Sequence, residues 1–241
     1  MIEIFAVLTN LAFVPAAVIS FYTHFYAEGF VYSSVVFFSS AYHICDSTEG
    51  LCFIGGLVTQ SRLDFFFATF TIPMSFLTWI DWGPYVGVKF ILLFIYATIV
   101  GVMLSVGLYS NVILIALSAS ALLILAIYWG IFYRWYGRWP SYDWYSSVIG
   151  STLCYMGCAF FLIQDNNWKL YDWTHGAWHL ASGLGQAFII LSTVPFVLER
   201  EFELLSNTLY KYKRKFPHFT DFISNYYPSV PIREKMVVFN V

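Results

Sequence analysis

Residues 85–106 read YVGVKFILLFIYATIVGVMLSV, and this stretch indicates the class of the protein. Lys89 is its only charged residue, and about 20 apolar residues are enough to cross the hydrocarbon core of a bilayer as a helix. Six similar segments occur elsewhere in the chain, at residues 2–22, 30–45, 63–80, 112–133, 146–163 and 174–198. We therefore predict an all-α membrane protein, a bundle of seven transmembrane helices.

The composition of the whole chain agrees with this class. Of the 241 residues, 59% are hydrophobic and 11% are charged, whereas about a quarter of the residues in a typical soluble domain carry charge. The mean hydropathy is +0.69. A formal net charge of -2 leaves no basic surface for neutralising phosphates, so we expect no nucleic-acid partner.

The basic residues predict how the bundle is oriented, because cytoplasmic loops of multispanning proteins carry an excess of Lys and Arg. With seven spans, Arg62 and Lys169 lie on one side of the membrane. The opposite side receives Arg134, Arg138, Arg200, Lys211, Lys213, Arg214, Lys215, Arg233 and Lys235. We therefore place the N-terminus outside the cell. Residues 1–198 are expected to form the seven-helix domain and residues 199–241 a cytosolic tail.

The beginning of this tail has the pattern of a basic amphipathic helix. Apolar side chains recur every three or four residues between Phe202 and Phe216, and four cations lie close by: Lys211, Lys213, Arg214 and Lys215. Each such cation near anionic lipid is worth about 1 kcal/mol. We interpret the segment as an anchor on the inner leaflet, with a regulatory switch as the alternative.

Ionisable residues inside predicted spans are candidates for function, because each costs at least ~2.5 kcal/mol to insert. His43, Asp64, His175 and His179 all fall in the outer half of the predicted bundle. His175 and His179 are four residues apart and share one helix face, and Ser39 and His43 repeat that spacing. Three imidazoles with an open fourth position would suit a catalytic zinc ion. Hydrogen-bonded core histidines are the alternative.

We expect Asp64 and Ser39 beside the metal rather than bound to it. An acidic group next to a metal-bound water can serve as general base, and we assign that role to Asp64. A helix N-cap is the alternative for this residue. Ser39 could donate a hydrogen bond to the water or to Asp64, or it could simply ease helix packing.

Taken in order, Ser39-x-x-x-His43, Asp64 and His175-x-x-x-His179 resemble the signature of the CREST superfamily of seven-span metal-dependent hydrolases. This superfamily includes alkaline ceramidases and the progestin and adiponectin receptors. Tyr42-His-Ile-Cys-Asp46, Cys52 and Asp64-Phe-Phe66 are similar to its transmembrane protein 8 branch. The similarity runs from the first span to about Pro195. Among the members of that branch, the length favours the short, myomaker type.

The resemblance implies a zinc site held by His43, His175 and His179, with Ser39 and Asp64 supporting it, in an outward-facing cavity reached by lipid. It implies a multipass protein of the plasma membrane, with the Golgi as a second location, that myoblasts need for fusion. Membrane lipids, a small fusogenic membrane peptide and a second copy in a homodimer are the implied partners.

Two other functions stay open at this stage. Long members of the same branch are similar to a lipase that cuts glycosylphosphatidylinositol anchors. A zinc-dependent intramembrane hydrolase of lipid esters or amides, with Asp64 as base, is therefore the alternative function. A receptor for a small hydrophobic ligand is the third option. The first two use the same residues, so the chemistry alone does not choose between them.

Two features depart from vertebrate members of the short type and favour an invertebrate one. No cysteine follows Cys158, whereas vertebrate members end in a cysteine-rich, palmitoylated tail, and the loop from Asp46 to Cys52 is shorter.

Cys45 and Cys52 could form a disulfide at the outer face, or Cys45 could pack inside its span. Asp46 could turn the loop or hydrogen-bond a ligating histidine.

Overall fold

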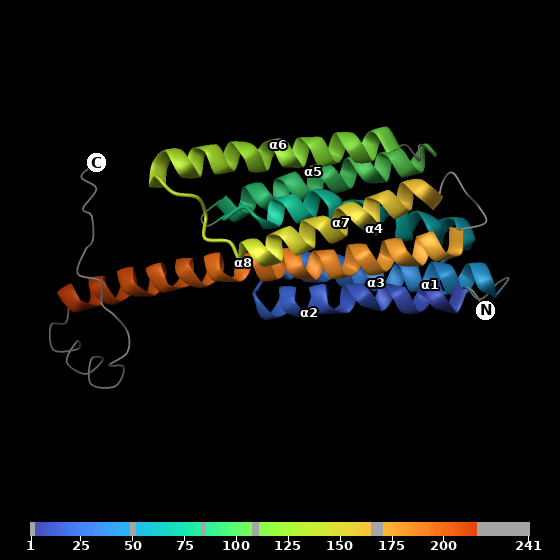
Figure 1. Cartoon of the computed structure of the whole chain (residues 1–241), viewed down its shortest axis with the longest axis horizontal. Coiled ribbons are helices and arrows are strands. Elements are labelled where there is room, and N and C mark those ends of the chain that lie inside the picture. Colours follow the sequence, from blue (N-terminus) through green and yellow to red (C-terminus); the bar gives the residue numbers. More distant parts are fainter. Residues whose placement is uncertain (1–2, 49–51, 83–84, 108–110, 165–170, 216–241) are drawn as a thin grey trace. The chain divides into compact units, whose positions relative to one another are not determined.

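The computed structural model of the chain describes residues 3–48, 52–82, 85–107, 111–164 and 171–215. Within these ranges all regular secondary structure is helical (Figure 1). The chain divides into two compact units, Met1–Pro195 and Phe196–Val241. The first unit contains the residues that the sequence identifies as candidates for a metal site.

Six long helices and one broken one run through the described part of the chain. The broken one consists of α1 (Glu3–Asn10), the 3-10 turn η1 (Leu11–Phe13) and α2 (Val14–Tyr22). The long helices are α3 (Tyr26–Ser47), α4 (Leu57–Thr78), α5 (Val86–Ser105), α6 (Asn111–Tyr136), α7 (Trp144–Gln164) and α8 (Tyr171–Lys215). Each overlaps one of the seven apolar segments.

The break in the first segment has a local cause. The sequence predicts one continuous helix over residues 2–22, but Pro15 occupies the first turn of α2. Proline has no backbone N–H, so the carbonyl of Leu11 receives no helical hydrogen bond from it. The chain passes through the tighter 3-10 geometry at Leu11–Phe13, which accommodates the proline without ending the helical rod.

Among the described residues, five helical stretches are long and apolar enough to cross a membrane: Phe5–Tyr22, Val86–Ser105, Ile115–Tyr136, Trp144–Ile163 and Trp173–Val197. Their outward faces carry large exposed apolar side chains such as Phe94, Leu123 and Tyr155. A helix that is apolar on all sides is typical of a membrane span. The protein is therefore helical and of membrane type.

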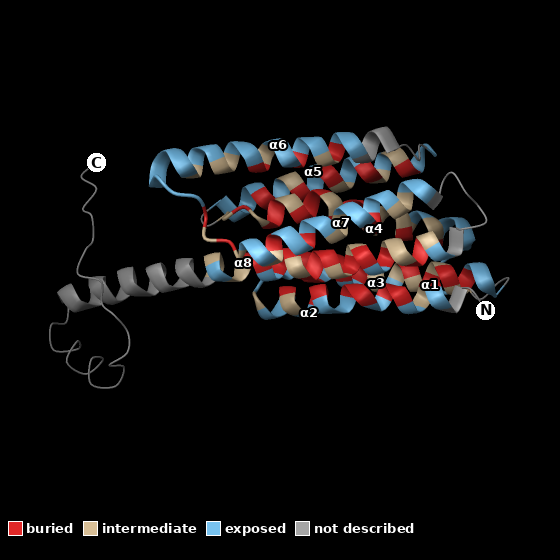
Figure 2. Ribbon diagram, viewed as in Figure 1, coloured by how far each residue is buried: buried red, intermediate tan, exposed pale blue. Residues whose placement is uncertain are grey.

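The helices α3 and α4 are less apolar, and they supply many of the polar side chains of the interior. Buried residues concentrate along α3, α4 and α8, whereas α6 and α7 are largely exposed (Figure 2). One apolar cluster joins α4, α5 and α6 around Met74, Leu77 and Leu125. A second cluster joins α2, α3 and α8 around Phe13, Tyr32 and Ile190. Together, the two clusters hold α3, α4 and α8 in the interior of the first unit.

The helices α7 and α8 approach each other closely because both present glycine at the contact. A Cβ atom added to Gly150 would lie 2.9 Å from the carbonyl oxygen of Gly185, and one added to Gly185 would lie 2.6 Å from Sγ of Cys154. On another side of α8, a Cβ on Gly183 would lie 2.6 Å from the carbonyl carbon of Ala12. These contacts determine the position of α8, as small residues commonly do in membrane bundles.

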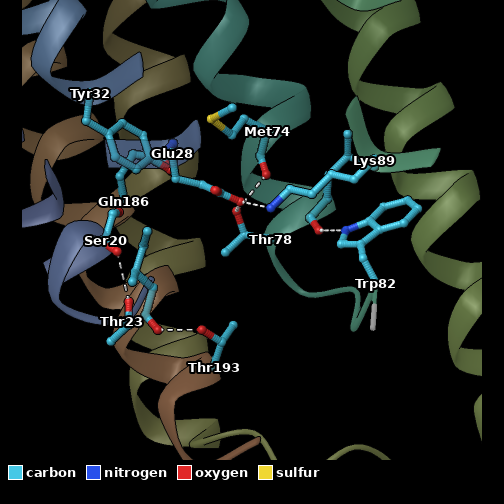
Figure 3. A network of polar contacts seen from close by, with 12 residues as sticks. Ser20, Thr23, Glu28, Tyr32, Met74, Thr78, Trp82, Lys89, Gln186 and Thr193 are labelled. Carbon is cyan, nitrogen blue, oxygen red and sulfur yellow. Dashed lines mark hydrogen bonds and ion pairs between the residues drawn. The ribbon is translucent and has the colours of Figure 1, made fainter. Parts of the chain in front are cut away.

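A buried ion pair lies far from the candidate histidines, toward the other end of α3. Glu28 of α3 pairs with Lys89 of α5, and Thr78 of α4 donates to the same carboxylate oxygen at 3.3 Å (Figure 3). Glu28 lies fifteen residues before His43, which is roughly 22 Å along the helix. Burying two charges costs several kcal/mol unless they are paired, so this contact constrains how α3 and α5 pack.

Gln186 of α8 connects the helices next to this ion pair. Its side-chain oxygen accepts hydrogen bonds from Tyr32 of α3 at 2.9 Å and from Ser75 of α4 at 2.7 Å. All three residues are buried. The hydrogen bonds therefore set the register of α3, α4 and α8, the three helices that carry the candidate site residues.

Candidate metal centre

Three histidines from two helices meet inside the bundle. His43 lies near the end of α3, and His175 and His179 lie in the first turns of α8. All three are buried. Nε2 of His175 is 3.0 Å from Nε2 of His43 and 2.9 Å from Nε2 of His179. One ring nitrogen from each histidine lies within 4.8 Å of the others, close enough to hold one metal ion.

The arrangement of these nitrogens fits a metal better than a set of hydrogen bonds. A ring nitrogen carries either one hydrogen or one lone pair, yet Nε2 of His175 faces two other ring nitrogens at once. A cation among the three would accept a lone pair from each of them. Zn–N bonds of about 2.0–2.1 Å in a tetrahedron place the nitrogens roughly 3.3 Å apart, close to the separations observed.

The donor set has three nitrogens, and no carboxylate of the described residues belongs to it. Three protein ligands with one position left for water or substrate is the pattern of catalytic zinc sites, whereas structural sites have four protein ligands. The predicted ligand set His43, His175 and His179 therefore comes together in the tertiary structure as a possible metal site.

Asp64 and Ser39 are both buried. Asp64 is in the second turn of α4, Ser39 is one turn before His43 on α3, and the Ser39 side chain lies near the Asp64 carboxyl group. The buried atoms of the described structure that lack a hydrogen-bond partner include Oγ of Ser39, Oδ1 of Asp64 and Nδ1 of His179. Buried polar atoms of this kind normally bind protein groups or ordered water. The site therefore has unused capacity for a polar ligand or water.

Aromatic rings to which the sequence analysis assigned no role in the site cover the histidines. The ring of Trp178 lies 4.5 Å from that of His179 and 5.2 Å from that of His175, measured between centroids. Phe161 of α7 packs on Trp178 at 5.2 Å, and Tyr42 lies 5.0 Å from His43. The only available signal was position, because Trp178 and Tyr42 are sequence neighbours of histidines. These rings restrict the rotation of the imidazoles.

Asp46 lies three residues after His43 on α3. It is exposed at the end of α3, and no hydrogen bond joins it to the three histidines in the described structure. The role of orienting a ligating histidine is therefore not supported by its position. Turning the loop after α3 is the role that its position allows.

Cys45 and Cys52 are joined by a disulfide, with their Cα atoms 4.6 Å apart. Cys45 is also buried, with an exposed fraction of 2%, so packing inside the bundle and pairing with Cys52 are both realised. The bond connects α3, two residues after His43, to the segment before α4. It therefore ties the loop to the helix that carries one of the histidines.

The four tail cations, Lys211, Lys213, Arg214 and Lys215, lie within the helical backbone of α8. The predicted span at residues 174–198 and the predicted amphipathic segment after it both fall in this one helix. The side chains beyond residue 197 lie outside the described part of the structure. Binding of this tail to a membrane surface stays a prediction.

Fold and site together define a helical protein of membrane type with three convergent buried histidines. The chain belongs to the family described as a protein of unknown function (DUF3522), whose sequence profile matches residues 1–180. The matched region includes His43, Asp64, His175 and His179. No curated protein matches the chain.

Proposed function

We propose that the chain is a seven-span member of the CREST superfamily, of the short myomaker type, that promotes fusion between cells at the plasma membrane. The observation that supports the superfamily assignment is the meeting of His43, His175 and His179 at one point. They are the residues that the sequence resemblance names as ligands. We further propose that the metal is zinc, because three imidazole nitrogens with a free position suit this ion.

We propose that all seven helices span the membrane, including α3 and α4. The helices α3 and α4 have 22 residues each, which corresponds to about 33 Å at a rise of 1.5 Å per residue. This length is enough to cross a hydrocarbon core of about 30 Å. Their polar side chains Glu28, His43 and Asp64 are buried against other helices, where they avoid contact with lipid. The N-terminus is then extracellular and the tail cytosolic, as the distribution of cations favours.

Each residue of the centre has a role in this proposal. Bound zinc supplies Lewis-acid polarisation and a link between α3 and α8. The histidines hold it as neutral ligands, and the packing of Trp178 against two of them keeps the rings in place. Asp64 and Ser39 bind water beside the histidines, because their unpartnered oxygens provide an acceptor and a hydroxyl.

Metal analysis of the purified protein tests the proposed site. We expect about one zinc per chain in the wild type and little in His175→Ala, because two imidazoles do not complete a site of this kind. His24→Ala is the matched control, since His24 lies outside the cluster and pairs with Tyr26 at 2.8 Å. Equal zinc in all three proteins, measured by inductively coupled plasma mass spectrometry, would contradict the assignment.

A lipid hydrolase is the second candidate, and the unpartnered Ser39 and Asp64 oxygens beside a three-nitrogen site favour it. In this role Asp64 accepts a proton from the attacking water and the substrate is an acyl ester or amide. The variant Asp64→Asn should retain zinc and lose hydrolysis of lipid ester or amide probes. If cells that express Asp64→Asn together with a small fusogenic membrane peptide still fuse at the wild-type rate, hydrolysis is not the basis of fusion.

The proposed partners follow from the same assignment. We propose membrane lipids, a small fusogenic membrane peptide and a second copy of the chain. The fusion assay above tests the peptide, because omitting it should abolish multinucleated cells. Light scattering of the purified protein with the detergent contribution subtracted tests the homodimer.

A further inference from the structure

The segment that connects α3 and α4 presents a compact apolar surface at the end of the bundle that holds the histidines. We call it the α3–α4 tip and define it by Phe53, Ile54, Leu57 and Val58. Their exposed fractions are 66%, 42%, 42% and 64%. Large apolar side chains gathered at the end of a bundle indicate a binding surface.

The tip is braced, so its side chains are presented in a defined position. The disulfide between Cys45 and Cys52 ties the residue before Phe53 to α3. The buried Gln60 of α4 holds the backbone, in the amide orientation that satisfies its hydrogen bonds. Its nitrogen donates to the Ala41 carbonyl at 2.7 Å, and its oxygen accepts from the amides of Phe53 and Ile54 at 2.7 and 3.0 Å.

The turn inside the tip also depends on a specific residue. Gly55 has a φ of 63°, and a Cβ there would lie 3.1 Å from the side chain of Thr59. Glycine adopts this left-handed conformation without steric cost. The exposed apolar side chains of the tip are therefore held in place by a disulfide, three side-chain hydrogen bonds and a glycine turn. Since its order is already built in, binding to it costs little conformational entropy.

Charge distribution and position favour lipid as the partner. No residue from 51 to 61 carries a charge, and the next one, Arg62, is exposed. Phe53 and Ile54 precede the first turn of α4, whose 22 residues span about 33 Å. If α4 crosses a core of about 30 Å, these two side chains lie at headgroup depth. Aromatic and apolar side chains with a nearby arginine are typical of that zone.

A second copy of the chain fits the tip less well. Four side chains of this size bury at most roughly 400 Å², about half of the ~800 Å² per partner in a stable protein interface. We propose that the α3–α4 tip is a lipid-binding wedge that lies in the headgroup region of the outer leaflet of the protein's own membrane. This inference rests on the proposed seven-span topology and needs neither the metal nor the fusion activity.

Photo-crosslinking of the full chain tests the wedge directly. The photoreactive residue p-benzoylphenylalanine replaces Phe53 in the test protein. It replaces Phe94, which is 73% exposed in the middle of α5, in a lipid-facing control, and Thr48, an exposed polar residue, in a second control. Each protein is placed in nanodiscs of phosphatidylcholine and phosphatidylserine, irradiated, and analysed by mass spectrometry for phospholipid adducts. A nanodisc holds one bilayer, so any adduct comes from the protein's own membrane.

We expect the lipid adduct at position 53 to approach the yield at position 94 and to exceed that at position 48 several-fold. A second outcome is lipid labelling at position 94 with a yield at position 53 that is no higher than at position 48. This outcome would overturn the wedge and leave the topology intact. A cross-linked dimer at position 53 would also overturn it, because the tip would then bind a second copy. Absence of lipid adducts at position 94 would overturn the membrane topology and the wedge together.

Discussion

At the residue scale, contacts between polar side chains of different helices organise the interior of this protein. Three ring nitrogens meet at His43, His175 and His179, and the carboxylate of Glu28 pairs with Lys89. Such groups are costly next to lipid, so each contact strongly constrains which helices can be neighbours. The ion pair brings two opposite charges together, whereas the histidines bring together three ring nitrogens that could hold one metal ion.

The ion pair leads to a prediction about stability. Lys89→Met should lower the free energy of unfolding by about 3–5 kcal/mol, because Glu28 would keep a buried charge without its partner. Adding Glu28→Gln to this variant should restore part of the loss, since a neutral amide needs no counter-charge. The measurement is unfolding of the purified proteins in mixed micelles with increasing denaturing detergent. A double variant at least as unstable as Lys89→Met would refute the argument.

At the element scale, the position of α8 decides whether His175 and His179 can reach His43. The glycines of α7 and α8 allow backbone contact at Gly150 and Gly185, and Gly183 lies directly on η1. Because α8 is held from two sides, its rotation about its own axis is restricted. The i, i+4 spacing of the two histidines then directs both rings toward α3.

A pair of glycine variants tests this packing. In Gly183→Ala, the new Cβ would lie 2.6 Å from the backbone of Ala12, so α8 must move and stability should fall by about 1–3 kcal/mol. Gly130→Ala is the control, because nothing lies within 4 Å of its Cβ position in α6, and alanine favours a helix by up to about 1 kcal/mol. Thermal unfolding of both purified proteins compares them. Equal melting temperatures would show that η1 does not constrain α8.

At the scale of the whole molecule, the proposed topology makes a prediction that does not depend on any single residue. With seven spans the two termini lie on opposite sides of the membrane. An epitope tag at the N-terminus should bind antibody on intact cells, and a tag at the C-terminus should bind it only after permeabilisation. The control is a cytosolic protein that stains only in permeabilised cells. Staining of both tags under the same condition would require an even number of spans.

Much of the fold could be predicted because an apolar segment long enough to cross a membrane also forms a helix there. Seven apolar segments predicted seven helical stretches, and each overlaps one in the structure. The predicted ends of the helices were less accurate where a helix continues into polar residues. The second segment was predicted from residue 30, whereas α3 begins at Tyr26 and includes Glu28. The buried pair of Glu28 with Lys89 was missed for this reason.

By itself the sequence determined that the chain is helical and of membrane type. It also determined which ionisable residues fall inside apolar segments. Both follow from hydropathy and helical period, which are properties of neighbouring residues. Only the tertiary structure decided which groups meet. It brought the rings of His43, His175 and His179 together, bridged Cys45 to Cys52, and left Asp46 exposed. The rotation of each helix about its own axis depends on long-range packing, and no local pattern encodes that angle.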